Sequence, residues 1–124
     1  MILSITSLEQ QAKLAADRVD ANAVGFDPLT ILSLITTILP LLMNCFNRSD
    51  EPNPSMVKAS FKRYHDAHPD LLRRRTARRI RGEADEPMTK EQSLLLADAV
   101  IAQALSVDAD TATACAHEAG RDIA

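Results

Sequence analysis

The chain has 124 residues, of which 46% are hydrophobic and 25% are charged, and its formal net charge is −3. Three glycines, four aromatic residues and no alternating runs of β-branched residues exclude a typical sheet core and predict helices. The two cysteines, Cys45 and Cys115, are too few for a disulfide-rich secreted scaffold and form no paired metal motif. We therefore predict an all-α protein with two free thiols.

The charges fall into blocks that the net value hides. Residues 1–27 carry four acids and two bases, residues 48–82 carry ten bases and four acids, and residues 83–124 carry nine acids and two bases. No charged residue lies between Asp27 and Arg48. This order of acidic, apolar, basic and acidic blocks indicates segments with different surroundings.

A first helix is predicted over residues 8–24. Ser7 followed by Gln10 matches a capping box, and Gly25 suits the left-handed position after a helix end. Such a helix would carry a stripe of mainly small residues at heptad spacing: Leu8, Ala12, Ala15, Val19, Asn22 and Phe26. The stripe favours close packing against a second helix.

The chain is organised around the uncharged segment 29–46. Asp27 suits an N-cap and Pro28 suits the first helical position, so we predict a helix that ends near Cys45 or Phe46. Eighteen residues span about 27 Å, close to the hydrocarbon thickness of a bilayer. The Leu, Ile and Phe residues of the segment favour insertion by about 3–6 kcal/mol, but its Thr, Ser, Pro and Asn residues oppose it. A lone helix of this kind would insert only marginally.

One side of this helix is polar. Five residues follow it at steps of three and four and form a predicted oligomerisation seam: Thr30, Ser33, Thr37, Pro40 and Asn44. Small and hydroxyl residues gather where helices meet in lipid, so the seam predicts a homo-oligomer. Pro40 also predicts a kink near Thr36 and Thr37, whose hydroxyls would bond the freed carbonyl.

The remainder of the chain predicts a linker and a small helical bundle. Residues 48–54 contain two prolines and little to pack, so they divide residues 1–47 from residues 55–124. Four helices are predicted in the second region, over residues 55–67, 70–82, 90–105 and 109–119. The predicted N-caps are Ser55, Thr89 (with Gln92 as its capping-box partner) and Asp108, and Gly120 is predicted to end the last helix.

The second of these four helices is rich in arginine. Leu72, Thr76 and Ile80 would form a thin apolar stripe, and the candidate anion-binding residues cover the other sides: Arg73, Arg74, Arg75, Arg78, Arg79 and Arg81. Arginine forks onto phosphates or carboxylates. The alternatives are a lipid phosphate, a nucleic-acid phosphate, or neutralisation by the acidic residues that follow in the same chain.

No residue pattern predicts catalysis, a cofactor, a small-molecule substrate or a metal site. The chain has no glycine-rich phosphate loop and no nucleophile elbow. His65, His68, Cys115 and His117 do not match the ligand spacing of a zinc finger. We expect a protein that is not an enzyme.

Two functional hypotheses follow. In the first, a non-enzymatic structural protein self-associates through the 29–46 helix, either inserted in a bilayer or buried in an assembly. Its layout is similar to that of small one-span membrane proteins, including phage holins and minor virion proteins. The cluster of basic residues after the apolar segment would then place the C-terminal region on the cytoplasmic side. The sequence shows no cleavable signal peptide, so we do not expect secretion. In the second, a small helical module binds nucleic acid or a partner protein through the 73–81 helix.

Overall fold

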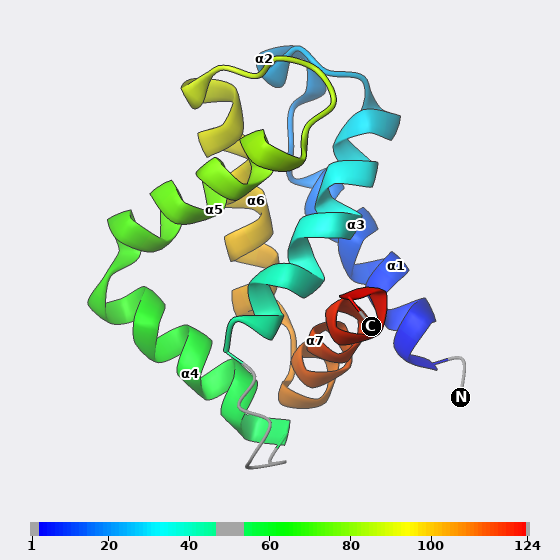
Figure 1. The fold of residues 1–124 in the computed structure, drawn as a ribbon, viewed down its shortest axis with the longest axis vertical. Coiled ribbons are helices and arrows are strands. Elements are labelled where there is room, and N and C mark those ends of the chain that lie inside the picture. Colours follow the sequence, from blue (N-terminus) through cyan, green and yellow to red (C-terminus); the bar gives the residue numbers. More distant parts are fainter. Residues whose placement is uncertain (1–2, 47–53, 124) are drawn as a thin grey trace.

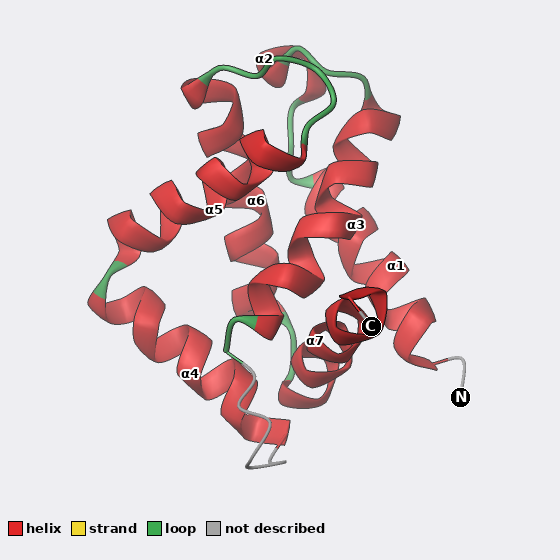
Figure 2. Cartoon of the chain, viewed as in Figure 1, coloured by secondary structure: helices red, strands yellow, loops and turns green. Residues whose placement is uncertain are grey.

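The computed structural model describes residues 3–46 and 54–123, and it describes side chains over residues 8–46 and 57–116. The described chain forms the helices α1 (Leu3–Asp17), α2 (Ala21–Val24), α3 (Pro28–Asn44), α4 (Pro54–Ala67), α5 (Pro69–Glu83), α6 (Lys90–Ser106) and α7 (Ala109–Ile123). Within these ranges no strand occurs (Figure 2). The all-α prediction is confirmed.

Helix α3 lies at the centre of the molecule (Figure 1). Helices α1, α4, α5, α6 and α7 all pack against it. Its buried residues are Ile31, Leu34, Ile35, Ile38, Leu39, Pro40, Leu42 and Met43. The apolar side of the segment that the sequence singles out is therefore covered by helices of its own chain.

The start of α3 matches the prediction. The Asp27 carboxylate accepts hydrogen bonds from the Thr30 N–H and the Thr30 hydroxyl, each at 2.9 Å. Pro28 occupies the first helical position, where a missing N–H leaves no bond unmade. Side-chain capping also begins α6, where Thr89 and Gln92 form both halves of the predicted capping box. Asp108 likewise accepts from the Thr111 N–H at 2.7 Å in front of α7.

Other predicted helix ends are wrong. The single helix expected over residues 8–24 is two helices, because the Asp20 side chain accepts from the Asn22 N–H and opens a separate α2. Ser7 lies inside α1, which already begins at Leu3. Ser55 lies inside α4 because Pro54 takes the first position, and α7 continues through Gly120. Gly25 does end a helix, α2, with a φ of 80° in the left-handed region.

One hydrophobic core joins the two parts of the chain that the sequence analysis separates. Buried side chains from α1 and α3 share a single cluster with those from α4, α5, α6 and α7. Helix α7 packs against α1, α3 and α4, and α6 packs against α1 to α5. The predicted linker 48–54 lies outside the described residues except for Pro54, which begins α4.

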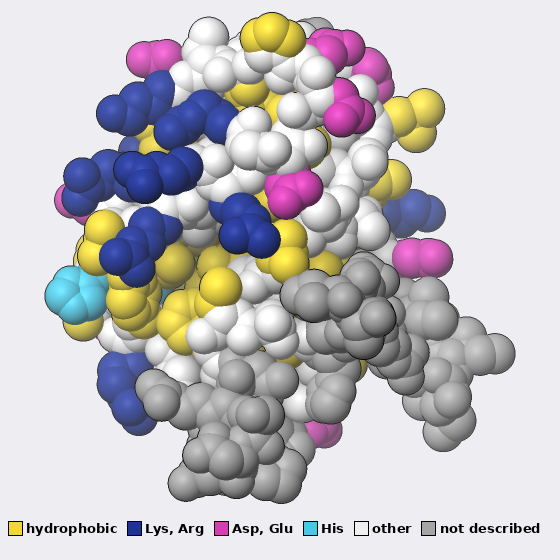
Figure 3. Space-filling view, viewed as in Figure 1, with side chains coloured by type: hydrophobic (Ala, Val, Ile, Leu, Met, Phe, Trp, Pro, Cys, Tyr) yellow, Lys and Arg dark blue, Asp and Glu magenta, His cyan; other side chains and the backbone are white. Residues whose placement is uncertain are grey.

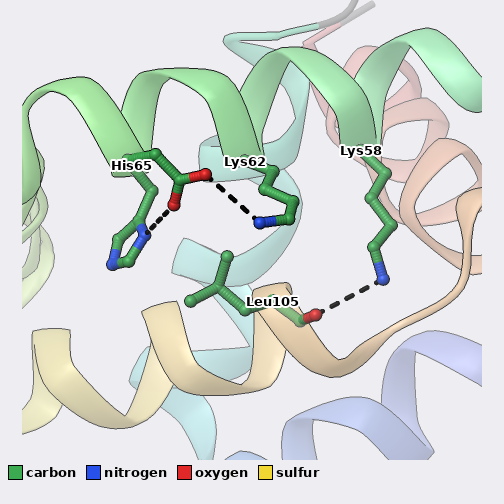
Figure 4. A network of polar contacts seen from close by, with 5 residues as sticks. Lys58, Lys62, His65 and Leu105 are labelled. Atoms are coloured by element: carbon green, nitrogen blue, oxygen red, sulfur yellow. Dashed lines mark hydrogen bonds and ion pairs between the residues drawn. The ribbon is translucent and has the colours of Figure 1, made fainter.

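Polar side chains fix both ends of α6 to other helices. At its start, Gln92 Nε2 donates to the Val24 carbonyl at 2.6 Å. At its end, Lys58 Nζ from α4 donates to the Leu105 carbonyl at 3.3 Å (Figure 4). The same ammonium group also donates to the Val107 carbonyl. A cation is favourable there because the last carbonyls of a helix carry a partial negative charge.

Candidate anion-binding groove

Helix α5 is held by a narrow apolar stripe. Leu72, Thr76, Ala77 and Ile80 are its buried residues, and they recur at steps of three and four. The predicted stripe of Leu72, Thr76 and Ile80 is therefore confirmed. Because so few positions of α5 face the core, its arginines project from the remaining sides.

The structure divides the six predicted anion-binding arginines into two groups. Arg73 makes a two-pronged ion pair with Asp98 of α6, at 2.6 and 3.0 Å. Arg79 lies 3.7 Å from the Glu83 carboxylate one turn later. The Asp98 hydrogen bonds raise the pKa of Arg73 above its ordinary value. These two arginines are engaged by acids of the same chain.

The other four arginines line a groove between α5 and the first turns of α6. The groove has a volume of about 330 Å³, and its lining residues are Leu71, Arg74, Arg75, Ala77, Arg78, Arg81, Lys90 and Leu94. Five cations therefore converge on one hollow, and none of its lining residues is an acid. Lys and Arg side chains gather over this part of the molecule in Figure 3.

Contacts to neighbouring groups orient two of the groove arginines. Arg81 Nη1 donates to the Ser93 hydroxyl at 2.8 Å, and that hydroxyl donates to the Lys90 carbonyl at 2.7 Å. Arg74 Nε donates to the Asp70 carbonyl at 3.4 Å. Among the described residues, Arg75 and Arg78 make no side-chain hydrogen bond or ion pair, so their donors are available to a ligand.

Lys90 is the groove residue that sequence reasoning missed. It lies in an acidic block and is the first residue of α6. The signal was present, since the capping box places the start of α6 and a six-residue connection returns the chain beside the end of α5. The contacts Arg81–Ser93 and Arg73–Asp98 show that the two helices run in opposite directions.

The five residues of the predicted α3 seam lie in different surroundings. Ser33 and Thr37 are exposed, Thr30 and Asn44 are half-buried, and Pro40 is buried, so the five residues do not share one environment. The Thr36 and Thr37 hydroxyls donate to the carbonyls of Leu32 and Ser33. The prediction that they bond the carbonyl freed by Pro40 is wrong, because each hydroxyl reaches the carbonyl four residues before it.

The hypothesis of a membrane-spanning helix gains no support from the described residues. In the described part of the chain, no helix combines the length and apolar character needed to cross a bilayer. The same residues hold no group of three potential metal ligands. His65 instead shares Asp66 with Lys62 on α4, at 3.3 and 3.2 Å (Figure 4). The pKa of Asp66 is lowered first by the hydrogen bond from Lys62.

Cys115 is buried in the core, Cys45 is exposed at the end of α3, and no disulfide joins the two thiols. The His117 side chain lies outside the described residues.

Comparison of the chain with models of protein families, with curated proteins and with solved structures finds no match.

Proposed function

We propose that this chain is a small, non-enzymatic helical module that binds a nucleic acid in the groove between α5 and α6. The observation that carries the proposal is the convergence of Arg74, Arg75, Arg78, Arg81 and Lys90 on one hollow with no acid in its lining. Phosphate contacts from Lys and Arg supply most non-specific affinity for nucleic acids.

A polymer in the groove suits these residues better than a membrane surface does. A helix that lies in a bilayer interface must expose an apolar face to the lipid. The apolar stripe of α5 is already buried against its own chain, and Leu72, Ala77 and Ile80 are each no more than 3% exposed. The face that remains is cationic and hollowed, which favours a strand of phosphates.

The proposal predicts a particular salt dependence. If all five cations contact phosphates, the slope of log K against log salt should approach about −4.5 on duplex DNA and about −3.5 on single strands. Fluorescence anisotropy with labelled oligonucleotides at several salt concentrations measures that slope. A slope near zero would contradict the proposal.

Two matched double variants test where the binding occurs. Arg75→Glu with Arg78→Glu changes the groove, and Lys13→Glu with Arg63→Glu makes the same change of net charge at exposed positions on α1 and α4. We expect the groove variant to lose affinity at least about tenfold and the control to lose much less. Equal losses would show attraction to overall charge, and unchanged affinity in both would place the binding elsewhere. Binding of anionic vesicles in place of oligonucleotides would favour a membrane surface and overturn the proposal.

A further inference from the structure

The groove cations form a line along α5. Arg74, Arg78 and Arg81 are separated by four and three residues, so they follow one side of the helix. Their axial steps are about 6 and 4.5 Å. Arg75 lies next to this row, and Lys90 joins it from α6. The arginines of this row are therefore attached to α5 about every 5 Å along its axis.

Apart from its cations, the groove lining offers no side chain suited to reading a base. Its residues other than the cations are Leu71, Ala77 and Leu94, all aliphatic. Stacking on aromatic side chains supplies about 1–3 kcal/mol per base in proteins that bind single strands. Here Phe61 and Tyr64 instead pack around Phe46, with ring centroids 5.3 and 5.8 Å away, where α3 meets α4. The lining also has no amide to pair with adenine and no carboxylate to pair with cytosine.

The size of the groove points the same way. A volume of about 330 Å³ is at the small end of ligand sites and holds a short run of phosphates. Arg81 is held by Ser93, whose side chain is fully buried, so its guanidinium is pre-positioned with its other donors free for a ligand. Pre-positioning lowers the ordering cost of binding.

We infer that the groove recognises a run of consecutive phosphates and nothing else of a nucleic acid, so that inorganic polyphosphate occupies the same site. This deepens the proposed function, because both ligands use the same five cations. The nucleic acid would then bind through its backbone without sequence preference. The polyphosphate would bind as a bare chain of the same chemistry.

Competition between the two ligands tests the inference. A labelled oligonucleotide is bound to the full chain, and medium-chain inorganic polyphosphate is added at constant ionic strength. Orthophosphate and polyglutamate serve as controls for single phosphates and for charge alone. We expect polyphosphate to displace the oligonucleotide at phosphate concentrations within about threefold of those of unlabelled DNA, and both controls to fail. Poly(dA), poly(dT) and a guanine-rich strand should compete equally, because arginine reads guanine more readily than the other bases.

The variants locate the site for each ligand. Arg75→Ala with Arg78→Ala should weaken both polyphosphate and DNA about tenfold or more and lower the salt slope by about 2. Lys13→Ala with Arg63→Ala should change neither. Circular dichroism spectra of both variants should match the parent, because the substituted side chains are exposed.

The outcomes separate this inference from the proposed function. DNA binding that polyphosphate cannot displace would overturn the inference and leave the proposed function standing. Polyphosphate binding without DNA binding would overturn the proposed function and leave only the polyphosphate site of the inference standing. Equal competition by polyglutamate would overturn recognition of phosphate, and failure of both DNA and polyphosphate to bind would overturn both proposals.

Discussion

Helices α3 and α5 have opposite compositions, but both belong to one core. Helix α3 has no charged residue, and eight of its seventeen positions are buried. Helix α5 is mostly arginine and polar residues, and only four of its fifteen positions are buried. The two meet where Ile35 and Ile38 of α3 lie beside Ile80 of α5, together with Leu96 and Val100 of α6.

The difference shows that the width of the apolar stripe sets the role of each helix in this chain. A wide stripe makes α3 the helix that the others cover. A narrow stripe anchors α5 while leaving its cations outside, where they line the groove. Substituting a buried residue of either stripe should therefore lower the free energy of unfolding markedly. Substituting a residue of these helices outside the stripes should change it little.

The largest effects are expected where the two stripes touch. Ile35→Ala and Ile80→Ala should each lower the free energy of unfolding by about 2–5 kcal/mol, because both side chains are 1% exposed and truncation leaves a cavity. Urea denaturation followed by circular dichroism measures the loss. The double variant should depart from additivity by about 0.5–3 kcal/mol, since the residues are neighbours. Strict additivity would mean that the two parts of the chain do not share this core.

A smaller effect is expected at the start of α6, which packs against both helices. Thr89→Ala removes the hydroxyl that accepts from the Gln92 N–H and should lower the free energy of unfolding by about 1 kcal/mol. Thr89→Ser keeps the hydroxyl and should retain most of that stability. Equal losses in the two variants, measured by thermal melting, would contradict a capping role.

The helix starts should also differ in their response to acid. The backbone hydrogen bond from Thr30, followed by its hydroxyl, lowers the pKa of Asp27 below its ordinary value of 3.8. Folding therefore favours the ionised carboxylate, so its contribution is present above that value and is lost as pH falls through the lower, folded pKa. Helix α5 has no carboxylate cap, because His68 precedes it without a side-chain bond.

An Asp27→Asn variant isolates this acid dependence. Asn can cap a helix but does not ionise, so the parent should be the more stable protein at neutral pH and the two should converge below the folded pKa. Urea midpoints measured across the acid range provide the comparison. A stability difference that stays constant with pH would contradict the assignment.

The ion pair between α5 and α6 should contribute little. The Arg73 and Asp98 side chains are 41% and 48% exposed, so a double-mutant cycle with alanine should give a coupling of about 0–1 kcal/mol that falls with added salt. A much larger coupling would mean that the pair, and not the apolar stripe, holds α5 in place.

The smallest effect on stability is expected on the solvent side of α3. Ser33→Ala and Thr37→Ala should change the free energy of unfolding by less than about 0.5 kcal/mol. The predicted seam is tested separately by sedimentation of the parent and of Ser33→Arg with Thr37→Arg. If the seam joins copies of the chain, the arginine variant should dissociate them. A monomeric parent would contradict the seam.

Local signals in the sequence predicted most helix boundaries. Asp27 with Pro28, and Thr89 with Gln92, act through bonds within four residues, so their outcome does not depend on distant packing. The Asp20 cap that separates α2 from α1 is equally local. The sequence analysis missed it because the predicted stripe of small residues continues past Asp20. The wrong helix ends at Ser55 and Gly120 show that one favourable residue does not fix a boundary.

The surroundings of α3 were harder to predict, because an apolar helix fits lipid and protein alike. Besides α1 and α4, the helices that cover it are α5, α6 and α7, which lie far along the chain. The groove could be predicted only in part, because it too depends on how distant helices pack. The arginine row follows from helical spacing, but Lys90 joins it only through the packing of α5 against α6.

The packing of α7 on α3 has a consequence for synthesis of the chain. Residues 28–44 leave the ribosome roughly 65 residues before α7 begins at Ala109, a delay of about 3–13 s at ordinary elongation rates. During that time the most hydrophobic surface of the protein lacks a principal cover. The nascent chain should therefore be a substrate for chaperones that bind exposed apolar segments until translation passes α7.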